Sequence, residues 1–413
     1  MNIFYLGIKN IFSKALSSFL SILLFGFGVA IIVMILLAST FLKEEINKNA
    51  QGIDLVVGAK GSPLQIILAS VFHIDYPTGN ISLNDANNLV RNRLIASAIP
   101  LSLGDSYKGY RIVGTTQAYP ELYGASLETG EWFKEEMTAT VGASVARSLG
   151  IQIGDELESA HGLAEGGGGH EEHPFTVVGI MQPTGSVLDQ LILVSVPSVW
   201  AVHGAHDEEE HEEADHEALI TLERLGLEVT QEQLENEDVT SLLIKYRSPM
   251  AAVQLPRMVN GTSNLQAASP PYETARLFNI IGVGVDVVNV LALVIVILSA
   301  VSVFIALLNS LKERKYELAI MRSMGASQLK IFTLIMMEGF LLTLVGGLFG
   351  FFLAHGGFYL LSNSMEQLQP NGMFFVEDEY YVMAGSALVG IFASIIPAVL
   401  AYRSDISETL AKA

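Results

Sequence analysis

Four long apolar runs constrain this chain more than any other feature of its sequence. They cover residues 19–42, 287–310, 331–361 and 380–402. Each is long enough for a helix to cross a ~30 Å hydrocarbon core, which takes roughly 20 predominantly apolar residues. Half of the chain is hydrophobic, and its mean hydropathy is +0.43. We therefore expect an α-helical membrane protein with four transmembrane helices.

The segment before the first run favours a retained span over a signal peptide. Lys9 and Lys14 precede the run and could form the basic region of a signal peptide. The apolar stretch is, however, longer than the roughly 7–15 residues of a signal-peptide core, and no small-x-small cleavage site follows it. Residues 1–18 show helical spacing of apolar positions such as Phe4 and Ile8. We expect them to form an amphipathic helix on the cytoplasmic face of the membrane.

Residues 43–286, between the first two runs, have the composition of a separate acidic domain. They contain 34 acidic and 14 basic residues, whereas the rest of the chain contains nine of each. Short apolar runs bounded by turn residues predict strands at 95–103 and 107–116, and a helix at 139–149 that ends at Gly150. We expect a large α/β domain with its own core. Its negative charge excludes nucleic acid as a partner.

Residues 311–330 form a charged, helix-favouring loop between the second and third runs. Its basic residues are Lys312, Arg314, Lys315, Arg322 and Lys330. Short basic loops between spans stay in the cytoplasm. With four spans, both termini (including the tail 403–413) then lie in the cytoplasm, and the domain and the acidic loop 362–379 lie outside.

The same loop has the residues of a tight turn between two helices. We expect residues 312–324 to continue the second span as a helix. Gly325 can take the left-handed conformation that ends a helix, and Ser327 is placed to cap the third span. A rigid turn of this kind transmits a displacement rather than absorbing it.

Five stretches form a pattern in chain order. They are TGEWF at 129–133, VGASVARSLGIQIGD at 141–155, FTVVGI at 175–180, ERKYELAIMRSMGAS at 313–327 and PAVLAYR at 397–403. Together they resemble the permease subunits of MacB-like and FtsX-like (type VII) ABC transporters. The resemblance covers nearly the whole chain, and implies a MacB-like periplasmic core domain inserted between the first and second spans.

The resemblance also implies how such a subunit works. Two four-span subunits form a homodimer or heterodimer in the bacterial inner membrane, in contact with membrane lipid. A separate cytoplasmic ATPase, which holds the ATP and Mg²⁺, drives them. Its energy is transmitted to the periplasmic domains (mechanotransmission), where an adaptor or effector can bind. The resemblance places residues 313–327 at the contact with the ATPase.

Within that contact we expect charged residues to face the ATPase and apolar ones to add a hydrophobic surface. The candidate coupling residues are Glu313, Arg314, Glu317, Leu318, Met321, Arg322, Gly325 and Ser327. Ile320 belongs to the same apolar set. The plainer interpretation is an ordinary basic loop that obeys the positive-inside rule.

Two acidic, histidine-rich inserts interrupt the domain at residues 161–173 and 203–217. They contain seven of the nine histidines: His161, His170, His173, His203, His206, His211 and His216. Imidazole with carboxylate suits Zn²⁺, Cu²⁺ or Ni²⁺, so the inserts are a candidate zinc site. The alternative is a solvated acidic insert in which histidine is incidental.

For the two remaining histidines and for a pair of glycines, a structural role is the first interpretation. His73 and His355 are expected to be packed and hydrogen-bonded, and His355 is the better functional candidate because ionisable groups are costly in membranes. Gly346 and Gly350 have the GxxxG spacing of close helix packing.

We expect no enzymatic activity from this chain and no cofactor bound to it. Residues 54–63 are glycine-rich but lack the GxxxxGK[ST] spacing of a phosphate loop. Cysteine is absent, so thiolate chemistry and disulfides are excluded. The expected function is export or extraction of a peptide, lipid, lipoprotein or small hydrophobic compound. The alternatives are a signalling regulator of a periplasmic partner, and a metal-linked transport or sensing system.

Overall fold

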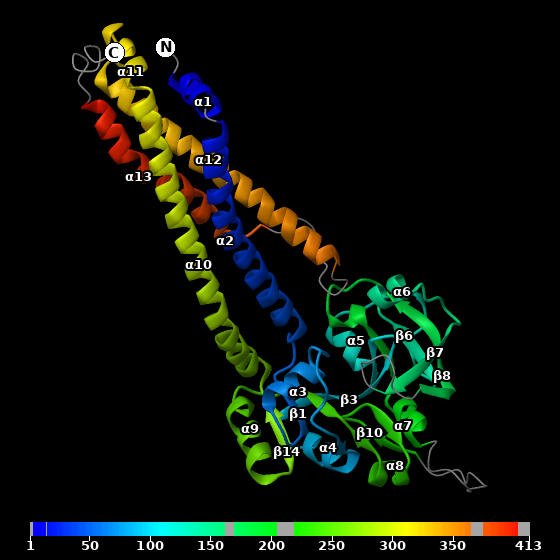
Figure 1. Cartoon of the computed structure of the whole chain (residues 1–413). Coiled ribbons are helices and arrows are strands. Elements are labelled where there is room, and N and C mark those ends of the chain that lie inside the picture. The colour runs from blue at the N-terminus through cyan, green and yellow to red at the C-terminus, as the bar shows by residue number, and fades with distance from the viewer. Residues whose placement is uncertain (1–2, 14, 162–168, 205–218, 365–374, 404–413) are drawn as a thin grey trace. The chain divides into compact units, whose positions relative to one another are not determined.

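The computed structural model describes residues 3–13, 15–161, 169–204, 219–364 and 375–403 (Figure 1). Its contacts divide the chain into two compact units. The helical unit contains residues 1–43 and 281–413, and the α/β unit contains residues 44–280. Both boundaries fall inside a helix, because α2 and α10 each run from one unit into the other without a break.

The helical unit is built from long apolar helices. The helices are α1 (Ile3–Ser13), α2 (Ala15–Asn49), α10 (Pro270–Glu313), α11 (Lys315–Ser323), α12 (Gln328–Ser364) and α13 (Glu379–Tyr402). Four of the described helices, α2, α10, α12 and α13, are long and apolar enough to cross a membrane. At 44 residues α10 is about 66 Å long, at 1.5 Å per residue, and so exceeds the thickness of the bilayer core.

Two expected helix boundaries in this unit are wrong. The amphipathic segment, expected over 1–18, is the separate helix α1 and ends at Ser13. The second span does not continue through residue 324, because α10 ends at Glu313 and α11 begins at Lys315.

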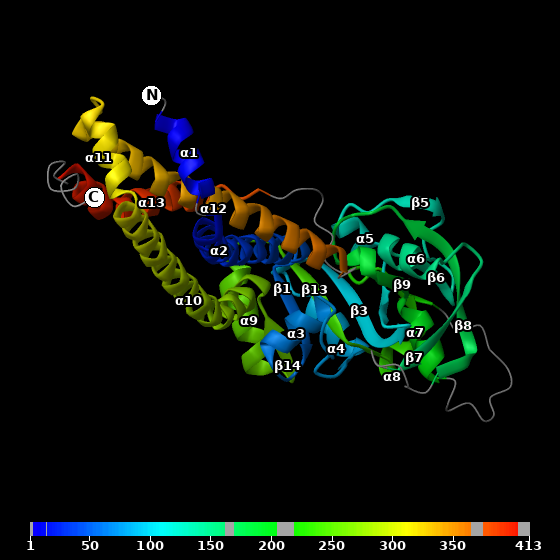
Figure 2. The ribbon, with the colours of Figure 1, turned by 45° about the horizontal axis from the view of Figure 1, so that its top comes forward.

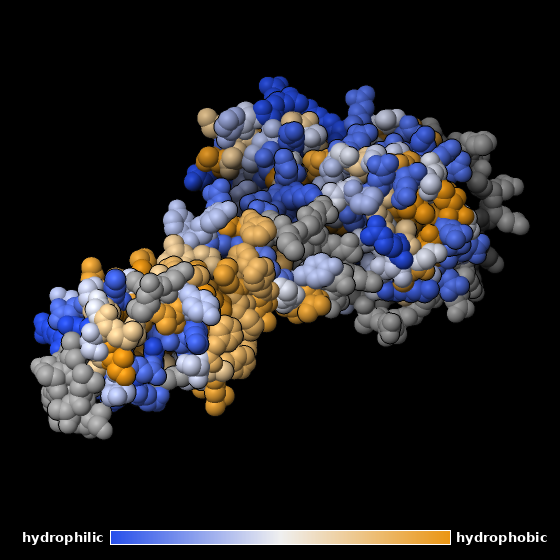
Figure 3. All heavy atoms as spheres, turned by 90° about the horizontal axis from the view of Figure 1, so that it is seen from above, coloured by the Kyte–Doolittle hydropathy of each residue, from blue (hydrophilic) through white to orange (hydrophobic). Residues whose placement is uncertain are grey.

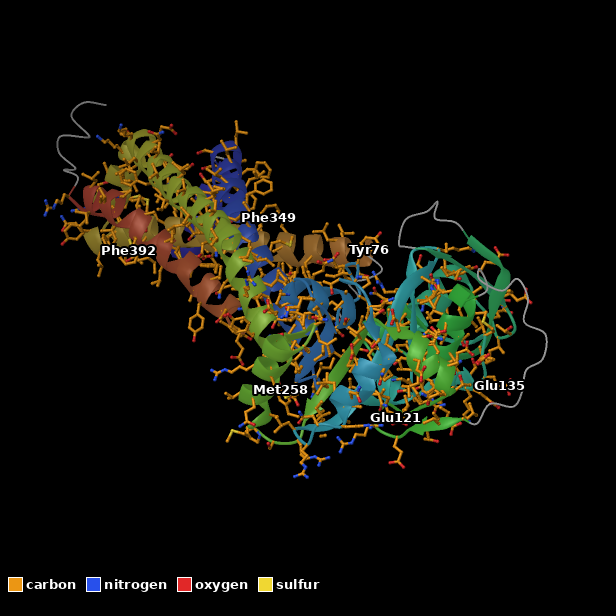
Figure 4. The ribbon with its side chains drawn as sticks, turned by 90° about the horizontal axis from the view of Figure 1, so that it is seen from below. Tyr76, Glu121, Glu135, Met258, Phe349 and Phe392 are labelled. Carbon is orange, nitrogen blue, oxygen red and sulfur yellow. The ribbon has the colours of Figure 1, made fainter. Side chains whose placement is uncertain are left out.

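The surface of the helical unit has the character of a membrane-embedded protein. Apolar side chains cover much of it in the view of Figure 3. Phe349 on α12 is 42% exposed and Phe392 on α13 is 68% exposed (Figure 4). A continuous apolar surface of this extent is unstable in water and favours a lipid environment.

The α/β unit contains one large mixed sheet. Its strands are β1 (Leu55–Ala59), β3 (Ile95–Tyr107), β4 (Tyr110–Thr115), β5 (Leu127–Gly130), β6 (Thr138–Val141), β7 (Glu156–His161), β8 (Gly169–Met181), β9 (Leu191–Ser195), β13 (Ser241–Tyr246) and β14 (Leu265–Ala268). The order is β14-β1-β13-β3-β4-β9-β6-β8-β5, and β7 pairs with both β3 and β8. The pairs β4/β9 and β6/β8 are parallel, and the others are antiparallel.

Two small two-stranded sheets and several short helices complete the unit. The strands are β2 (Ile81–Ser82) with β12 (Asp238–Val239), and β10 (Ile220–Leu222) with β11 (Leu227–Val229). The helices are α3 (Pro63–Ser70), α4 (Leu83–Val90), α5 (Ala118–Leu122), α6 (Ala143–Leu149), α7 (Val196–Gly204), the 3₁₀ turn η1 (Val187–Gln190), α8 (Gln231–Asn236) and α9 (Ala251–Thr262).

Both faces of the sheet are buried, because successive side chains of a strand point to opposite faces. In β13, Leu242 and Ile244 pack in one core with α4 and α9. Leu243, between them, packs in a second core with α3 and α5. The expectation of an α/β domain is confirmed. The helix predicted over 139–149 is wrong at its start, since Thr138–Val141 is strand β6 and α6 begins only at Ala143.

Candidate functional site

The predicted coupling segment is a short helix set apart from the span before it. α11 (Lys315–Ser323) follows the break at Arg314 and lies at the same end of the helical unit as α1 (Figures 1 and 2). A nine-residue helix is marginal by itself, so packing must hold it in place. The contacts of Arg314 and Leu318 supply that packing.

Arg314 is turned into the helical unit rather than toward a partner. Its Nη1 lies 3.1 Å from Oε1 of Glu338 on α12, and its Nε lies 3.1 Å from Oε2 of Glu317. The side chains of Arg314 and Glu338 are 12% and 4% exposed. Asn10 of α1 also donates a hydrogen bond to Glu338. The expectation that Arg314 faces the ATPase is wrong, because its guanidinium joins three helices at a buried carboxylate.

The expected apolar surface of α11 is also placed differently. Leu318 is 3% exposed and packs with Leu311, Ile331 and Ala398 in a core of the helical unit. Met321 packs against the same core. These two side chains therefore anchor α11 to the bundle; Leu318 is buried there, and Met321 is partly buried.

The opposite side of α11 presents an apolar stripe that sequence reasoning largely missed. Tyr316, Ile320 and Met324 are 50%, 36% and 82% exposed. Tyr316 and Ile320 are four residues apart on one face of α11, and Met324, the residue directly after the helix, continues the same spacing. Glu313 and Glu317 are exposed nearby, and Arg322 is partly buried. The stripe could have been found from the spacing alone, but Leu318 and Met321 offered an equally apolar face.

The turn after α11 is tightly defined. Gly325 has a φ of +98°, as expected for the residue that ends the helix. Its N–H donates to the carbonyl of Arg322, and the N–H of Ala326 donates to the carbonyl of Met321, both at 3.0 Å. This is the Schellman pattern. Ser327 then caps α12, because its Oγ accepts the N–H of Lys330 at 3.3 Å.

The glycine pair Gly346 and Gly350 brings α12 against α2 of the same chain. A Cβ at Gly350 would overlap the carbonyl oxygen of Gly26, and one at Gly346 would lie 3.2 Å from the carbonyl oxygen of Ile22. On another side of α12, a Cβ at Gly339 would lie 3.0 Å from the carbonyl oxygen of Gly390 on α13. These glycines allow backbones to approach where larger residues would not fit.

The last turn of α2 is bonded to a loop of the α/β unit. Lys48 Nζ donates to the carbonyl of Thr184 at 3.0 Å, and Asn49 Oδ1 accepts the N–H of Val187 at 2.9 Å. The hydroxyl of Tyr123 donates to the carbonyl of Asn49 at 2.8 Å. The carboxylate of Asp189 holds the same loop by accepting hydrogen bonds from Thr184 and Gly185. The end of α2 is thus fixed to two parts of this unit, the loop at 184–187 and Tyr123.

His73 and His355 are both packed, as expected. His73 has a φ of +55°, and its Nε2 lies 2.8 Å from the hydroxyl of Tyr119. Burial, with the Arg111 charge, lowers the pKa of His73 to about 3. His355 on α12 stacks with Phe351, and its Nε2 is 3.6 Å from Oε1 of Glu379.

The histidine-rich inserts are only partly within the described residues. His206, His211 and His216 lie outside them, and the side chains of His161, His170 and His173 are likewise not described. His203 is described: its Nε2 lies 3.2 Å from Oδ2 of Asp105. This hydrogen bond raises the pKa of the His203 imidazole, while partial burial opposes the rise. Among the described side chains, no three histidine or carboxylate groups come together as a metal site.

Comparison with known families gives two matches that together cover most of the chain. Residues 18–254 match the MacB-like periplasmic core domain. Residues 289–406 match the FtsX-like permease C-terminal domain. No curated protein matches the chain.

The solved structures that are similar to this chain include two periplasmic or extracellular regions, each at 12% sequence identity. The periplasmic region of MacB from Actinobacillus actinomycetemcomitans covers 57% of this chain and 98% of its own, with a TM-score of 0.33. The extracellular domain of the noncanonic ABC-type transporter YknZ from Gram-positive bacteria covers 52% and 99%, with a TM-score of 0.30. The family models are the stronger finding, since one alone covers more than half of the sequence. With its membrane-spanning helices, this chain belongs to the MacB/FtsX-like family of ABC transporter permeases.

Proposed function

We propose that this chain is the permease subunit of a bacterial inner-membrane ABC system, and that α11 receives the movement of a separate cytoplasmic ATPase. The observation that carries the proposal is the two-sided construction of α11. One side is fixed to the bundle by Arg314 and Leu318, and the other presents Tyr316, Ile320 and Met324 to solvent. A partner that pushes on the exposed side moves the bundle, because the helix cannot yield independently.

Continuous helices support transmission from α11 to the α/β unit. α10 connects directly to the break at Arg314 and runs through the unit boundary to Pro270. α2 crosses the other boundary and ends in the hydrogen bonds of Lys48 and Asn49. Each of these helices is continuous across the boundary, so neither has a loop there at which a displacement would be absorbed.

The orientation follows from charge. The loop around α11 contains an excess of Lys and Arg, which favours the cytoplasm. We accordingly place α11 and both termini in the cytoplasm and the α/β unit in the periplasm. ATP and Mg²⁺ belong to the ATPase, and a second permease copy, identical or related, completes the assembly.

The work done on the periplasmic side is export or extraction of a peptide, lipid, lipoprotein or small hydrophobic compound. A regulator that activates a periplasmic partner without transport would use the same parts. A strain that lacks this chain separates the two: loss of one exported compound supports transport. Intact export together with a cell-wall defect supports the regulator.

The stripe on α11 is tested by copurification. In detergent-solubilised membranes, the double variant Tyr316→Ala/Met324→Ala should lose most of the ATPase that copurifies with the tagged chain. Tyr272→Ala is the matched control, because Tyr272 is 70% exposed on the α/β unit. Undiminished ATPase in the double variant would contradict docking on this face.

A further inference from the structure

An apolar cavity in the helical unit lies where α1 leads into α2 beside α12. Its volume is about 550 Å³, within the range of roughly 300–1,000 Å³ that is usual for small-molecule pockets. All but one of its described lining residues are apolar, the exception being Ser18. The walls include Phe4, Ile8 and Phe12 of α1, Ala15 of α2 and Val345 of α12. Such a lining offers almost no hydrogen-bonding partner, so the cavity suits a hydrocarbon chain rather than a polar ligand.

The cavity is open toward the outside of the helical unit and is not enclosed in its core. Among its aromatic walls, Phe4, Phe12 and Phe19 are 51%, 76% and 59% exposed. Exposed apolar walls in a membrane-spanning unit are accessible to lipid from the side. A lipid chain can therefore enter this cavity from the bilayer without passing through the bundle.

A basic side chain flanks the apolar walls. Lys9 is the one charged residue of α1, and it is exposed. Residues three apart on a helix are neighbours, so Lys9 lies beside Phe12, at the edge of the cavity wall. No acidic residue is among the described lining residues. A lysine stem lies along apolar surface while its ammonium group stays in the polar layer of the membrane, where it attracts anionic lipid headgroups.

The same charge disfavours a second copy of this chain as the occupant of the cavity. A two-fold contact through this face would bring Lys9 of both copies to one interface. Like charges brought together in this way oppose association. The charge and the apolar walls together fit an amphiphile with a negative headgroup.

Another side of α1 packs on the bundle. A Cβ added at Gly7 would lie 3.6 Å from the side chains of Leu341 and Met337 on α12. Asn10 donates a hydrogen bond to the buried Glu338, which also pairs with Arg314. At 11 residues α1 is marginal as an isolated helix, so its contacts must hold it in place. A molecule in the cavity supports α1 on the side that the bundle does not contact.

We propose that this cavity binds one acyl chain of an anionic phospholipid, with the headgroup at Lys9. The bound lipid holds α1 against α12 and so keeps Asn10 on Glu338. The site differs from the general lipid contact of the spans, because it is a cavity with a defined charge at its edge. The proposal does not rest on the coupling role of α11, nor on the side of the membrane at which α1 lies.

Native mass spectrometry of the full-length chain in detergent tests the proposal. Palmitoyl-oleoyl phosphatidylglycerol, which is anionic, and the zwitterionic phosphatidylcholine with the same chains are each titrated against the delipidated chain. The expected result is one tightly bound lipid per chain, with a preference of about fivefold for phosphatidylglycerol, which is what one nearby lysine supplies. Lys9→Gln should remove this preference and leave the affinity for phosphatidylcholine unchanged.

Two variants fill the cavity from different walls. Ala15→Phe on α2 and Val345→Phe on α12 should each weaken phosphatidylglycerol binding at least about tenfold, because losing the burial of about two methylene groups costs that much. Leu16→Phe and Leu348→Phe are the matched controls, since both positions are exposed and neither is among the described lining residues. Thermal unfolding without lipid checks that each variant is folded, and either filling variant decides the test if the other fails to fold.

The outcomes that overturn the proposal are distinct. Lipid binding by the folded filling variants equal to that of their controls would show that the cavity is not the site. Equal binding of the two lipids by the unmodified chain would remove the role of Lys9 and the anionic headgroup. Loss of a dimer in Ala15→Phe with lipid binding unchanged would identify a second copy of the chain as the occupant.

Discussion

Arg314 is a charged residue whose role depends on a partner that lies 24 positions away in the sequence. Arg314 is the residue at the break between α10 and α11. Its guanidinium neutralises the carboxylate of Glu338, which is buried in the bundle. Removing one member of a buried ion pair leaves the other charge uncompensated, typically at a cost of about 3–5 kcal/mol. The pair therefore holds α11 in position more than it attracts an outside partner.

We expect Arg314→Ala to lower thermal stability in detergent and to separate ATP hydrolysis from the in vivo function. Adding Glu338→Gln should recover much of the lost stability, because no buried charge then remains without a partner. The control is Arg257→Ala, at an exposed position on α9. Equal melting temperatures for Arg314→Ala and the control would contradict a structural role of the pair.

His73 makes the α/β unit sensitive to acid. Its pKa is about 3 in the folded chain against an ordinary value of 6.5, so the unfolded state binds a proton that the folded state does not. Above pH 6.5 both states are neutral at this residue and it contributes nothing. Stability should fall as pH drops from 6.5 toward 3, by up to about 1.4 kcal/mol per pH unit.

Replacement of His73 by Asn should reduce this pH dependence, since Asn does not titrate and tolerates positive φ. The measurement is thermal unfolding, followed by tryptophan fluorescence, at several values between pH 7 and pH 4. Tyr76→Phe, at an exposed position (Figure 4), serves as the control. An unchanged pH slope in His73→Asn would show that other groups cause the acid sensitivity.

At the scale of elements, the turn between α11 and α12 is the part most sensitive to one substitution. Gly325 has a φ that β-branched residues avoid, although no atom would contact an added Cβ there. Gly325→Val should therefore act through backbone strain of about 1–3 kcal/mol and not through a clash. We expect membrane insertion to be retained and coupling between ATPase activity and function to be lost.

Gly325→Asn is the discriminating comparison, because Asn adopts left-handed conformations more readily. It should retain most of the coupling that Gly325→Val loses. The measurement is the amount of ATP hydrolysed for a given level of in vivo function, and this ratio is compared between the two variants. If both variants behave alike, side-chain size rather than backbone conformation matters at this position.

Elements were predictable from sequence where the signal was local. The spans follow from uninterrupted apolar runs, and the end of α11 follows from Gly325 and Ser327. The orientation of α11 was not predictable, because Leu318 and Ile320 give it apolar residues on both sides. Contacts distant in the sequence, of Arg314 with Glu338 and of Leu318 with the core of the bundle, decide between them. Strand β6 was missed because its residues Thr138–Val141 lie almost directly before α6 in the sequence. Only their pairing with β8 and β9 identifies them as a strand.

The candidate metal residues show the same limit. The histidine spacing indicated metal binding but gave no position in the fold. Asp105 lies 98 residues before His203, and no local pattern connects them. The packing of α7 against β3 brings them together.

At the scale of the whole molecule, the two uninterrupted helices at the unit boundary make a further prediction. Ile281→Pro should break α10 at the boundary, because proline removes a helix hydrogen bond and clashes with the preceding turn, costing about 3 kcal/mol or more. We expect ATPase binding and folding of the α/β unit to persist while the in vivo function is lost. Ile281→Ala is the control, and full function of the proline variant would contradict transmission through α10.

The glycine contact between α2 and α12 limits how these two helices can move. Gly26 meets Gly350, and Ile22 meets Gly346, with no room for a side chain between the backbones. Phe25 already lies against Gly346, and Phe349 lies against Gly26, so sliding α2 along α12 or turning it about its own axis would push these rings into the neighbouring backbone. The allowed movement is therefore rocking about this contact, with opposite displacements of the two ends of α2. The glycines form a pivot, and a small shift on one side of it becomes a tilt on the other.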